Sequence, residues 1–350
     1  MKVDILIPSK DRPAQLHQLL STLSRNVEGV GQITITIQAS NEKFKKGYEI
    51  LNERLFKDGH FKTLRSMATI IILYRNKLSE FDDALNHLGD SKLLLILADD
   101  EIFFGSINFK NNLAIKKFID DQSIHTCAIR LGRNITPNVP NTHSHFIKTQ
   151  PSFINQSSEY LIWTWPDNLD IDHWSCIYSV TGHIYRKNEF IKTLRLVAKD
   201  NFLQLEKKAP KYLVKDSFYI SLSFLSFIEY IDYVLERFLF RFVRIISQPV
   251  IFNFLVKSLF KMKVLRKKNS KIKMISLMQS VTAAISINSS HELVEDSYPF
   301  MSNERINQKY LKGYVFSKDI MNFIKFDEPN LIDSNKIVGI KFEKYIDLPQ

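Results

Sequence analysis

The chain has 350 residues, a formal net charge of +11, 45% hydrophobic residues and 24% charged residues. This composition excludes wholesale disorder, and the length allows one large domain or two ordinary ones. With 10 Gly and 2 Cys, the chain cannot be collagen-like, carry a disulfide framework or hold zinc through paired cysteines. The low cysteine content favours a reducing, cytoplasmic compartment.

The first hundred residues alternate between strands and helices. Apolar, partly β-branched runs predict four strands, over 3–7, 33–39, 68–74 and 92–98. Helical spacing of apolar residues follows each of the first three, and predicts helices over 13–25, 43–57 and 79–88, with caps at Ser9 to Asp11 and at Ser79. Strands that alternate with short helices predict a parallel α/β sheet.

The rest of the chain is less regular. We predict a helix over 109–121, a strand over 126–131, a proline-rich loop over 136–155 and a helix over 188–198. An aromatic-rich helical region over 217–264 and a basic segment over 261–273 come next. Strand signals return around 275–288 and a helix is predicted over 302–312.

The positive charge is concentrated in one stretch. Residues 237–291 contain eleven Lys and Arg and no Asp or Glu, which accounts for the whole net charge of +11. Such a stretch predicts an anionic partner, which could be a membrane surface, a nucleic acid or a polyanionic glycan. The chain opens without a secretory signal pattern, and its uncharged apolar runs are shorter than the ~20 residues of a membrane span, so we expect no transmembrane helix.

Three consecutive carboxylates, Asp99, Asp100 and Glu101, follow the fourth predicted strand directly. Ligands of open α/β sheets bind outside the carboxyl ends of the strands. Adjacent carboxylates repel one another unless a cation neutralises them, and hard divalent ions prefer such oxygens. The segment therefore indicates a Mg²⁺ or Mn²⁺ site for a diphosphate; the alternative is a solvated acidic turn or a helix N-terminus.

A second polar segment, Pro8-Ser9-Lys10-Asp11-Arg12-Pro13, follows the first predicted strand and should lie at the same edge of the sheet. Asp11 could accept hydrogen bonds from a base or ribose, and Lys10 and Arg12 could meet phosphate. The alternative is an ordinary turn between a strand and a helix, with a capping residue.

These residues resemble a known family. The opening over 3–23 resembles that of family 2-like glycosyltransferases of the GT-A fold, and Leu97-Ala98-Asp99-Asp100-Glu101-Ile102-Phe103 resembles their metal-binding DxD motif. Further blocks at 130–134, 163–165, 173–174, 179–185, 303–307 and 310–314 are similar to one uncharacterised bacterial subgroup. Together the blocks cover most of the chain except about 205–272.

The resemblance implies a Rossmann-like GT-A domain, with a mixed central sheet flanked by helices and a C-terminal helical, basic insert. Residues 1–104 would form the nucleotide-sugar-binding half and 105–204 the acceptor-binding half. Residues 205–273 would be the amphipathic, basic insert, and 274–350 would complete the GT-A domain.

The resemblance also implies roles for individual residues. The nucleotide sugar would be bound by Pro8, Ser9, Lys10, Asp11, Arg12 and Asp99. The metal, Mn²⁺ or Mg²⁺, would be held by Asp99, Asp100, Glu101 and His291, although a surface position is the alternative for His291. The sugar and acceptor pocket would be formed by Arg130, Trp163, Trp165, Trp174 and Gly182, because aromatic faces pack on sugars; core packing is the alternative for each Trp.

The catalytic base departs from the subgroup pattern, which has an Asp where His173 stands and another where Thr181 stands. An inverting transferase needs a base to deprotonate the acceptor hydroxyl. Asp172 could supply the base if the motif is displaced by one residue in this chain, and His183 could hold a phosphate or act as the base. A degenerate enzyme is the alternative.

The insert at 217–273 is the part that fits the family least. An amphipathic helix followed by a cationic run is typical of a segment that lies in a membrane interface, and each cation adds about 1 kcal/mol near an anionic surface. The alternative is that the apolar face packs on the domain and the basic run is a solvated loop. No helix-turn-helix, RNA-recognition or zinc-finger pattern supports nucleic acid as the partner.

The resemblance therefore implies a bacterial, metal-dependent, inverting glycosyltransferase of cell-surface polysaccharide biosynthesis. It would transfer a sugar from a nucleotide-diphosphate sugar to a glycan or lipid-linked acceptor, at a cytoplasmic location, peripheral on the inner face of the membrane. The alternative is a non-catalytic GT-A-like module that binds anionic membrane or glycan. A nucleotidyltransferase is a lesser rival, since the chain lacks a glycine-rich phosphate loop near its N-terminus.

Overall fold

A computed structural model describes the chain over residues 1–75, 81–134, 150–165, 174–197, 205–206, 208–210, 272–284, 302–316 and 342–345. One compact unit comprises Met1–Ala209 and Ile272–Gln350, and Pro210–Lys271 belongs to another. The predicted helical region at 217–264 and the basic run that follows it lie outside the described residues, apart from 272–273. In the described part of the chain, no helix combines the length and apolar character needed to cross a bilayer.

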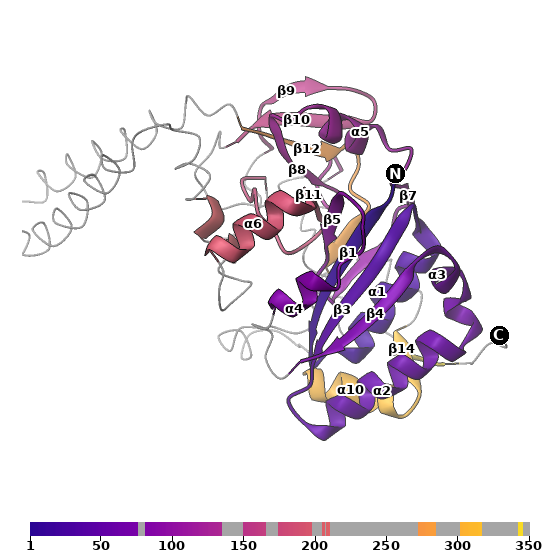
Figure 1. The fold of residues 1–350 in the computed structure, drawn as a ribbon. Helices are drawn as coiled ribbons and strands as arrows, with labels where there is room; N and C mark the ends of the chain where they lie inside the picture. Colours follow the sequence, from indigo (N-terminus) through magenta and orange to yellow (C-terminus); the bar gives the residue numbers. More distant parts are fainter. Residues whose placement is uncertain are drawn as a thin grey trace, which may run out of the picture. The chain divides into compact units, whose positions relative to one another are not determined.

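A nine-stranded mixed sheet forms the centre of the first unit, in the order β4-β3-β1-β5-β11-β8-β12-β10-β9 (Figure 1). The strands are β1 Val3–Lys10, β3 Val30–Gln38, β4 Thr69–Tyr74, β5 Leu93–Ile96, β8 Ile124–Ala128, β9 Phe153–Gln156, β10 Tyr160–Thr164, β11 His183–Arg186 and β12 Lys273–Leu277. The first four in the sheet, β4, β3, β1 and β5, are parallel. This half of the sheet is the one that alternating strands and helices predicted.

The other half is antiparallel in part. β11 runs antiparallel to both β5 and β8, and β10 runs antiparallel to both β12 and β9. β12, from late in the chain, lies between β8 and β10 and is parallel to β8. The predicted fold class, a mixed central sheet flanked by helices, is confirmed.

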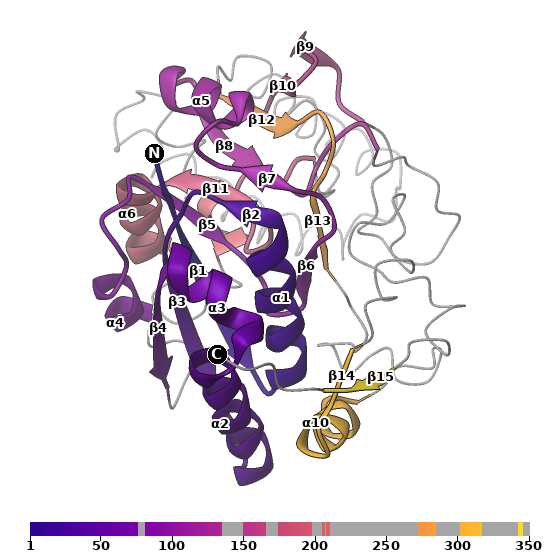
Figure 2. The ribbon, with the colours of Figure 1, turned by 90° about the vertical axis from the view of Figure 1, so that its right-hand side faces the viewer.

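Helices cover both faces of the sheet. Figures 1 and 2 show α1, α2 and α3 on one face, and α4 and α6 on the other. The helices are α1 Pro13–Asn26, α2 Glu42–Lys57, the 3-10 turn η1 Gly59–Phe61, α3 Lys62–Met67, α4 Phe81–Asn86, α5 Leu113–Asp120, α6 Lys187–Val197 and α10 Asn303–Leu311. Three two-stranded sheets complete the fold: β2 Val27–Glu28 with β7 Ile107–Asn108, β6 Glu101–Phe103 with β13 Thr282–Ala284, and β14 Tyr314–Phe316 with β15 Phe342–Lys344.

The two helices that flank the first strand begin in different ways. α1 begins with Pro13 in its first turn, where a missing N–H is harmless, and no side chain caps it. The expected cap from Ser9 to Asp11 is therefore wrong. α2 has a side-chain cap, since the Asn41 carboxamide oxygen accepts from the N–H groups of Lys43 and Phe44. The predicted cap at Ser79 lies outside the described residues.

The predicted loop over 136–155 is wrong at its end, where β9 begins at Phe153. β9 is an edge strand, and three of its four residues are exposed. An edge strand of this kind lacks the alternation of buried and exposed residues that identifies a strand in sequence. Residues 135–149 lie outside the described part of the chain.

Candidate functional site

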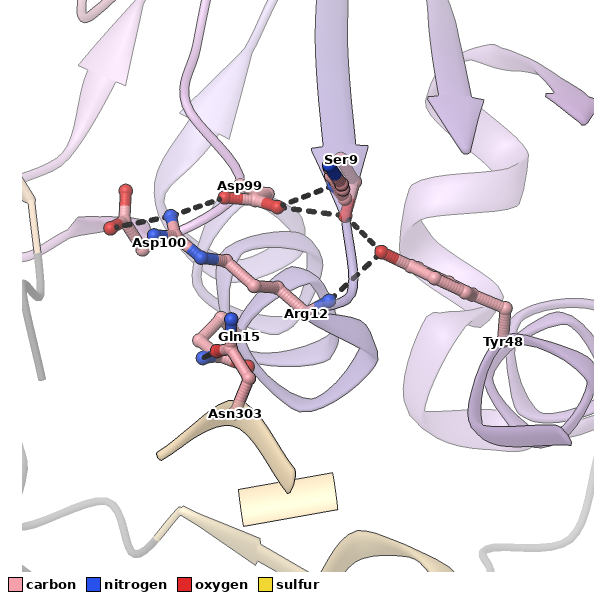
Figure 3. Close-up of polar contacts among 8 residues, drawn as sticks. Ser9, Arg12, Gln15, Tyr48, Asp99, Asp100 and Asn303 are labelled. Atoms are coloured by element: carbon pink, nitrogen blue, oxygen red, sulfur yellow. Dashed lines mark hydrogen bonds and ion pairs between the residues drawn. The ribbon is translucent and has the colours of Figure 1, made fainter. Parts of the chain in front are cut away.

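The predicted site residues gather at the carboxyl ends of two neighbouring strands. β1 and β5 are parallel and paired from Val3 with Leu93 to Leu6 with Ile96. Their continuations therefore place Ser9 and Arg12 beside Asp99 and Asp100, as Figure 3 shows. The two polar segments thus lie at the same edge of the sheet, as predicted.

Asp99 is held at this edge by three partners. Its Oδ2 accepts hydrogen bonds from the Ser9 hydroxyl at 2.8 Å and from the Lys10 backbone N–H at 3.3 Å. Its Oδ1 accepts from Arg12 Nη1 at 3.0 Å. Asp99 is 4% exposed, so these bonds replace the water that its carboxylate gives up on burial.

Arg12 bridges the two aspartates. The same Nη1 atom lies 3.0 Å from Asp100 Oδ2 and 3.0 Å from Asp99 Oδ1 (Figure 3). Burial alone lowers the pKa of Arg12, but the charges of Asp99 and Asp100 outweigh it and raise that pKa above its ordinary value. Burial raises the pKa of Asp99, and the charge of Arg12 opposes the rise. The cation that neutralises the aspartates is thus a side chain of the chain itself.

Tyr48, from α2, supports the same edge and carries no signal in the sequence beyond its place on the apolar face of a helix. Its hydroxyl lies 2.7 Å from Ser9 Oγ and accepts a hydrogen bond from the Arg12 backbone N–H at 3.0 Å. Burial, followed by the charge of Asp99, raises the pKa of Tyr48, so it remains a neutral hydroxyl. Tyr48 therefore links the backbone of Arg12 to the end of β1.

Asp11 shapes the turn that follows β1. It adopts a left-handed backbone conformation with φ of 57°, which Asp tolerates better than most residues. Its Oδ1 accepts a hydrogen bond from the Ser40 backbone N–H at 2.7 Å, and its own N–H donates to the Gln38 carbonyl at 3.1 Å. These contacts tie the end of β1 to the end of β3.

Glu101 differs from the two aspartates in its partner, because it is near Arg130 in the interior and is not paired with Arg12. It is 1% exposed, and its Oε2 is buried without a hydrogen-bond partner in the described part of the chain. Burial raises its pKa well above the ordinary value, and the charge of Arg130 opposes that rise. Among the described residues, the charge of Arg130 and a hydrogen bond from the Gly182 backbone favour the charged form of this buried carboxylate.

Arg130 is 4% exposed and donates a hydrogen bond to the Thr181 hydroxyl. Burial lowers its pKa, against the raising effect of Glu101 and the weaker effects of Cys176 and Glu206. Gly182 adjoins it with φ of 57°, and a Cβ there would lie 3.0 Å from Arg130 Cβ. The predicted pocket residues Arg130 and Gly182 thus pack against each other because glycine allows both the backbone conformation and the close approach.

Glu206 is a residue that sequence reasoning missed. Its Oε1 accepts hydrogen bonds from the Ser179 hydroxyl at 3.2 Å and from the Val180 N–H at 3.0 Å. Ser179 Oγ in turn lies 2.9 Å from the Thr181 hydroxyl. A chain of polar contacts therefore runs from Glu206 to Arg130, and nothing in the sequence around Glu206 signals it.

His183, one of the two proposed bases, lies in the middle of the central sheet. It is 1% exposed, and its Nδ1 is 3.5 Å from the Thr126 hydroxyl. Burial, followed by the charge of Arg130, lowers its pKa well below the ordinary value, so the imidazole is neutral near pH 7. The other proposed base, Asp172, lies outside the described residues.

The three tryptophans are packed inside the fold, at 1%, 5% and 2% exposure for Trp163, Trp165 and Trp174. The indole N–H groups of Trp163 and Trp165 donate to the carbonyls of Trp174 and Ser175, at 3.0 and 2.7 Å. Trp163 and Trp174 also meet edge to face, with ring centroids 5.1 Å apart. Their present contacts are with the protein itself, so a contact with sugar stays a prediction.

The blocks near the C-terminus connect distant parts of the chain. In α10, Asn303 Oδ1 accepts from Gln15 Nε2 at 3.1 Å, next to Arg12 (Figure 3), and Asn307 donates to the Lys43 carbonyl at 2.9 Å. Gly47 lets α2 approach closely, since a Cβ there would lie 2.4 Å from Asn307 Oδ1. The segment that resembles the family at 303–307 thus contacts α1 and α2 next to the site.

The residues present do not fit the predicted metal set. Arg12 takes one oxygen of each aspartate, the second oxygen of Asp99 is hydrogen-bonded to Ser9 and Lys10, and Glu101 is turned into the interior. Among the described residues, no three His, Cys, Asp or Glu side chains form a group that could hold a metal ion. The fourth predicted ligand, His291, lies outside them.

No family model and no curated protein matches the sequence. Among solved structures, S. aureus TarS is similar at 14% identity and a TM-score of 0.35, over 59% of this chain and 33% of that chain. S. aureus TarS 1–349 in complex with UDP-GlcNAc is similar at 13% and 0.34, over 59% and 53%. The mannosyltransferase PcManGT from Pyrobaculum calidifontis, in complex with GDP-Man and Mn²⁺, is similar at 14% and 0.27, over 38% and 36%.

The chain thus spans a third to about half of the length of these proteins. Likenesses with TM-scores of 0.27 to 0.35 and identities of 13–14% do not establish its function.

Proposed function

We propose that the chain is a glycosyltransferase of the GT-A fold that transfers a sugar from a nucleotide-diphosphate sugar to a glycan or lipid-linked acceptor. The observation that supports this most is the group of Ser9, Arg12, Asp99 and Asp100 at the carboxyl ends of β1 and β5. Open α/β sheets bind their ligands at this edge, and the sequence there resembles the donor site of the family.

Each residue at this edge has a proposed role. Arg12 and Lys10 meet the diphosphate, Asp99 meets the ribose, and Ser9 and Pro8 shape the end of β1 beneath the nucleoside. In this proposal residues 1–104 bind the donor, 105–204 bind the acceptor and 274–350 complete the domain. Arg130, Gly182 and the three tryptophans line the acceptor pocket in this proposal; Arg130 packs against Gly182, and Trp163 contacts Trp174 in the core.

The proposed reaction is a direct displacement with inversion at the sugar. The acceptor hydroxyl oxygen bonds to the anomeric carbon while the bond to the diphosphate oxygen breaks, and the leaving oxygen keeps the electron pair. The positive charge of Arg12 stabilises the charge that develops on the diphosphate. A base takes the proton of the hydroxyl. Asp172 is the proposed base, because His183 is buried. No step is assigned to Mn²⁺ or Mg²⁺, because Arg12 occupies an oxygen of Asp99 and an oxygen of Asp100 that a metal ion would use.

We place the enzyme in cell-surface polysaccharide biosynthesis, at the inner face of a bacterial membrane. The support for this is the cationic stretch over 237–291, which would dock reversibly on anionic lipid.

Two observations favour a second candidate, a GT-A-like module that binds anionic membrane or glycan without catalysis. Thr181 stands where the family resemblance implies a carboxylate, and its hydroxyl accepts a hydrogen bond from Arg130. His183 is buried in the sheet. A module of this kind would be indifferent to the loss of Asp172, whereas the transferase would lose its activity.

The test is thermal unfolding of the full chain with UDP, GDP, dTDP and CMP, each in EDTA and in Mn²⁺. A nucleotide at 100 times its Kd adds about 2.7 kcal/mol of stability, which raises Tm by several degrees in a chain of this size. We expect one nucleotide to do so in the wild type and to lose most of its effect in Asp99→Asn, because Asp99 is the residue proposed to meet the ribose.

The matched control is Asp90→Asn. Asp90 is an exposed carboxylate that precedes β5, at the opposite end of the strand from Asp99. It should leave the nucleotide effect unchanged. The proposal fails if no nucleotide stabilises the folded wild type, or if Asp99→Asn retains full nucleotide binding and transfer activity.

A further inference from the structure

Arg12 occupies the position that a bridging cation would take at this site. One nitrogen atom, Nη1, is 3.0 Å from a carboxylate oxygen of Asp99 and 3.0 Å from one of Asp100. The side chains are 14%, 6% and 10% exposed, so the three charges are largely removed from water. The charge of the guanidinium, shared through one nitrogen atom, therefore compensates the two buried carboxylates without a bound ion.

The backbone of Arg12 is fixed on both sides. Its N–H donates to the Tyr48 hydroxyl at 3.0 Å, and its carbonyl accepts from the Leu16 N–H at 3.0 Å. Pro13 follows directly and restricts the backbone further. The guanidinium therefore projects from an anchored position, unlike that of a mobile surface arginine.

The guanidinium also keeps donors for a ligand. Arg has five N–H groups, and the two aspartates use those of Nη1. In the described part of the chain, no residue accepts a hydrogen bond from Nε or Nη2 of Arg12. These N–H groups form a planar fork of the type that binds phosphate oxygens in pairs.

We infer that Arg12 is the resident cation of the carboxylate pair, and that a nucleoside diphosphate binds here through its guanidinium without a divalent metal ion. A metal bridging Asp99 Oδ1 and Asp100 Oδ2 would have to displace Arg12 from both oxygens. Arg12 and a metal therefore compete for the same two atoms, and Arg12 has the advantage of being attached. The inference rests on the proposed function for the identity of the anion, but not for the exclusion of the metal.

The first experiment uses Mn²⁺ alone, with no nucleotide. Binding of Mn²⁺ to the full chain is measured by electron paramagnetic resonance for the wild type, Arg12→Gln and the double variant Arg12→Gln with Asp100→Asn. We expect Arg12→Gln to bind one Mn²⁺ at least tenfold more tightly than the wild type, and the double variant to lose that gain. Removal of the cation leaves two adjacent carboxylates that attract a metal ion.

Arg12→Lys provides a second variant if Arg12→Gln does not fold, since Lys retains the charge but its side chain is one atom shorter and does not reach the position of Nη1. It should bind Mn²⁺ more tightly than the wild type, though less so than a variant with no cation. Asp90→Asn should leave Mn²⁺ binding unchanged. The inference is overturned if the wild type binds one Mn²⁺ as tightly as the Arg12 variants do.

The second experiment measures the stabilisation of the wild type and Arg12→Gln by the nucleotide, in EDTA and in Mn²⁺. We expect equal shifts of Tm for the wild type in both, and a shift for Arg12→Gln only in Mn²⁺. A wild type that binds nucleotide only with Mn²⁺ overturns the inference and leaves the proposed function standing. A wild type that binds no nucleotide refutes the proposed function, and the Mn²⁺ experiment still decides the role of Arg12.

Discussion

Arg12 and Arg130 lie near the same turn, Asp99 to Glu101, and meet its carboxylates in opposite ways. Arg12 is at the edge of the sheet, with its side chain 14% exposed and 3.0 Å from an oxygen of each aspartate. Arg130 is in the interior, where it donates to Thr181 and faces the buried Glu101. The pKa of Arg12 is raised, because its pairing outweighs its burial, whereas burial lowers the pKa of Arg130.

The difference separates two tasks that charged residues perform at a site. A cation that is paired and still reachable from solvent can exchange its partners for a ligand, so its loss should be felt mainly in binding. A cation enclosed among buried groups cannot exchange them, so its loss should be felt mainly in folding. The predictions that follow test this division.

The largest effect is expected from Arg130→Met. The substitution keeps most of the side-chain volume but leaves Glu101 buried without an opposite charge, which costs about 3–5 kcal/mol of unfolding free energy. Urea unfolding measures it. The double variant with Glu101→Gln should recover part of the loss, because the amide has no charge to compensate.

Arg305→Met is the control for that substitution, since Arg305 is exposed on α10. It should change the unfolding free energy by no more than about 0.5 kcal/mol. A cost for Arg130→Met as small as that of the control would show that the interior arginine has no structural task, and the division between the two regions would be lost.

A smaller effect, and one that depends on pH, is expected from His183. Its pKa in the folded chain lies well below the ordinary value of 6.5, through burial and then Arg130. Below pH 6.5 the unfolded chain therefore binds a proton that the folded chain does not, and stability is lost as pH falls. The loss is about 1.4 kcal/mol for each pH unit below 6.5, and it is absent above that pH.

The measurement is urea unfolding at pH 8 and pH 5 for the wild type and for His183→Gln, which cannot titrate. The wild type should lose about 2 kcal/mol more than the variant between the two pH values. Equal losses would mean that His183 titrates normally in the folded chain. It would then be accessible enough to act as the base that its position in the sequence suggested.

The sequence was most informative where strands are fully buried and connected by helices. Leu93–Ile96 is a continuous apolar run, and Val3–Ile7 is one interrupted only by Asp4, because both faces of those strands are covered; such runs are visible without an alignment. Their order along the chain also places their carboxyl ends together, which is why the polar segments around Arg12 and Asp99 could be assigned to one edge of the sheet.

The antiparallel half of the sheet was not predictable in the same way. β11 has only four residues, His183–Arg186, and a histidine at its start conceals its burial. It enters the sheet between β5 and β8, so its strand character comes from neighbours that are distant in sequence. The partner of Arg12 was missed for a related reason. We expected Arg12 to meet phosphate, but no rule of sequence spacing connects residue 12 to residues 99 and 100, and the pairing emerges only when β1 and β5 lie side by side.

The smallest effect is expected from Tyr48→Phe, which removes a single hydroxyl. The loss leaves Ser9 Oγ and the Arg12 N–H without that partner and should cost about 1 kcal/mol of stability, which urea unfolding measures. Tyr160→Phe is the control, since Tyr160 is only partly buried and its hydroxyl makes no hydrogen bond among the described residues; it should leave the site unaffected.

Because Tyr48 anchors the backbone of Arg12, its loss should also loosen the guanidinium and raise the affinity for Mn²⁺ above that of the wild type. A cost in stability close to that of Arg130→Met, with Mn²⁺ binding unchanged, would place Tyr48 with the interior group. The edge of the sheet would then be part of the folding core and no longer a site built to exchange partners.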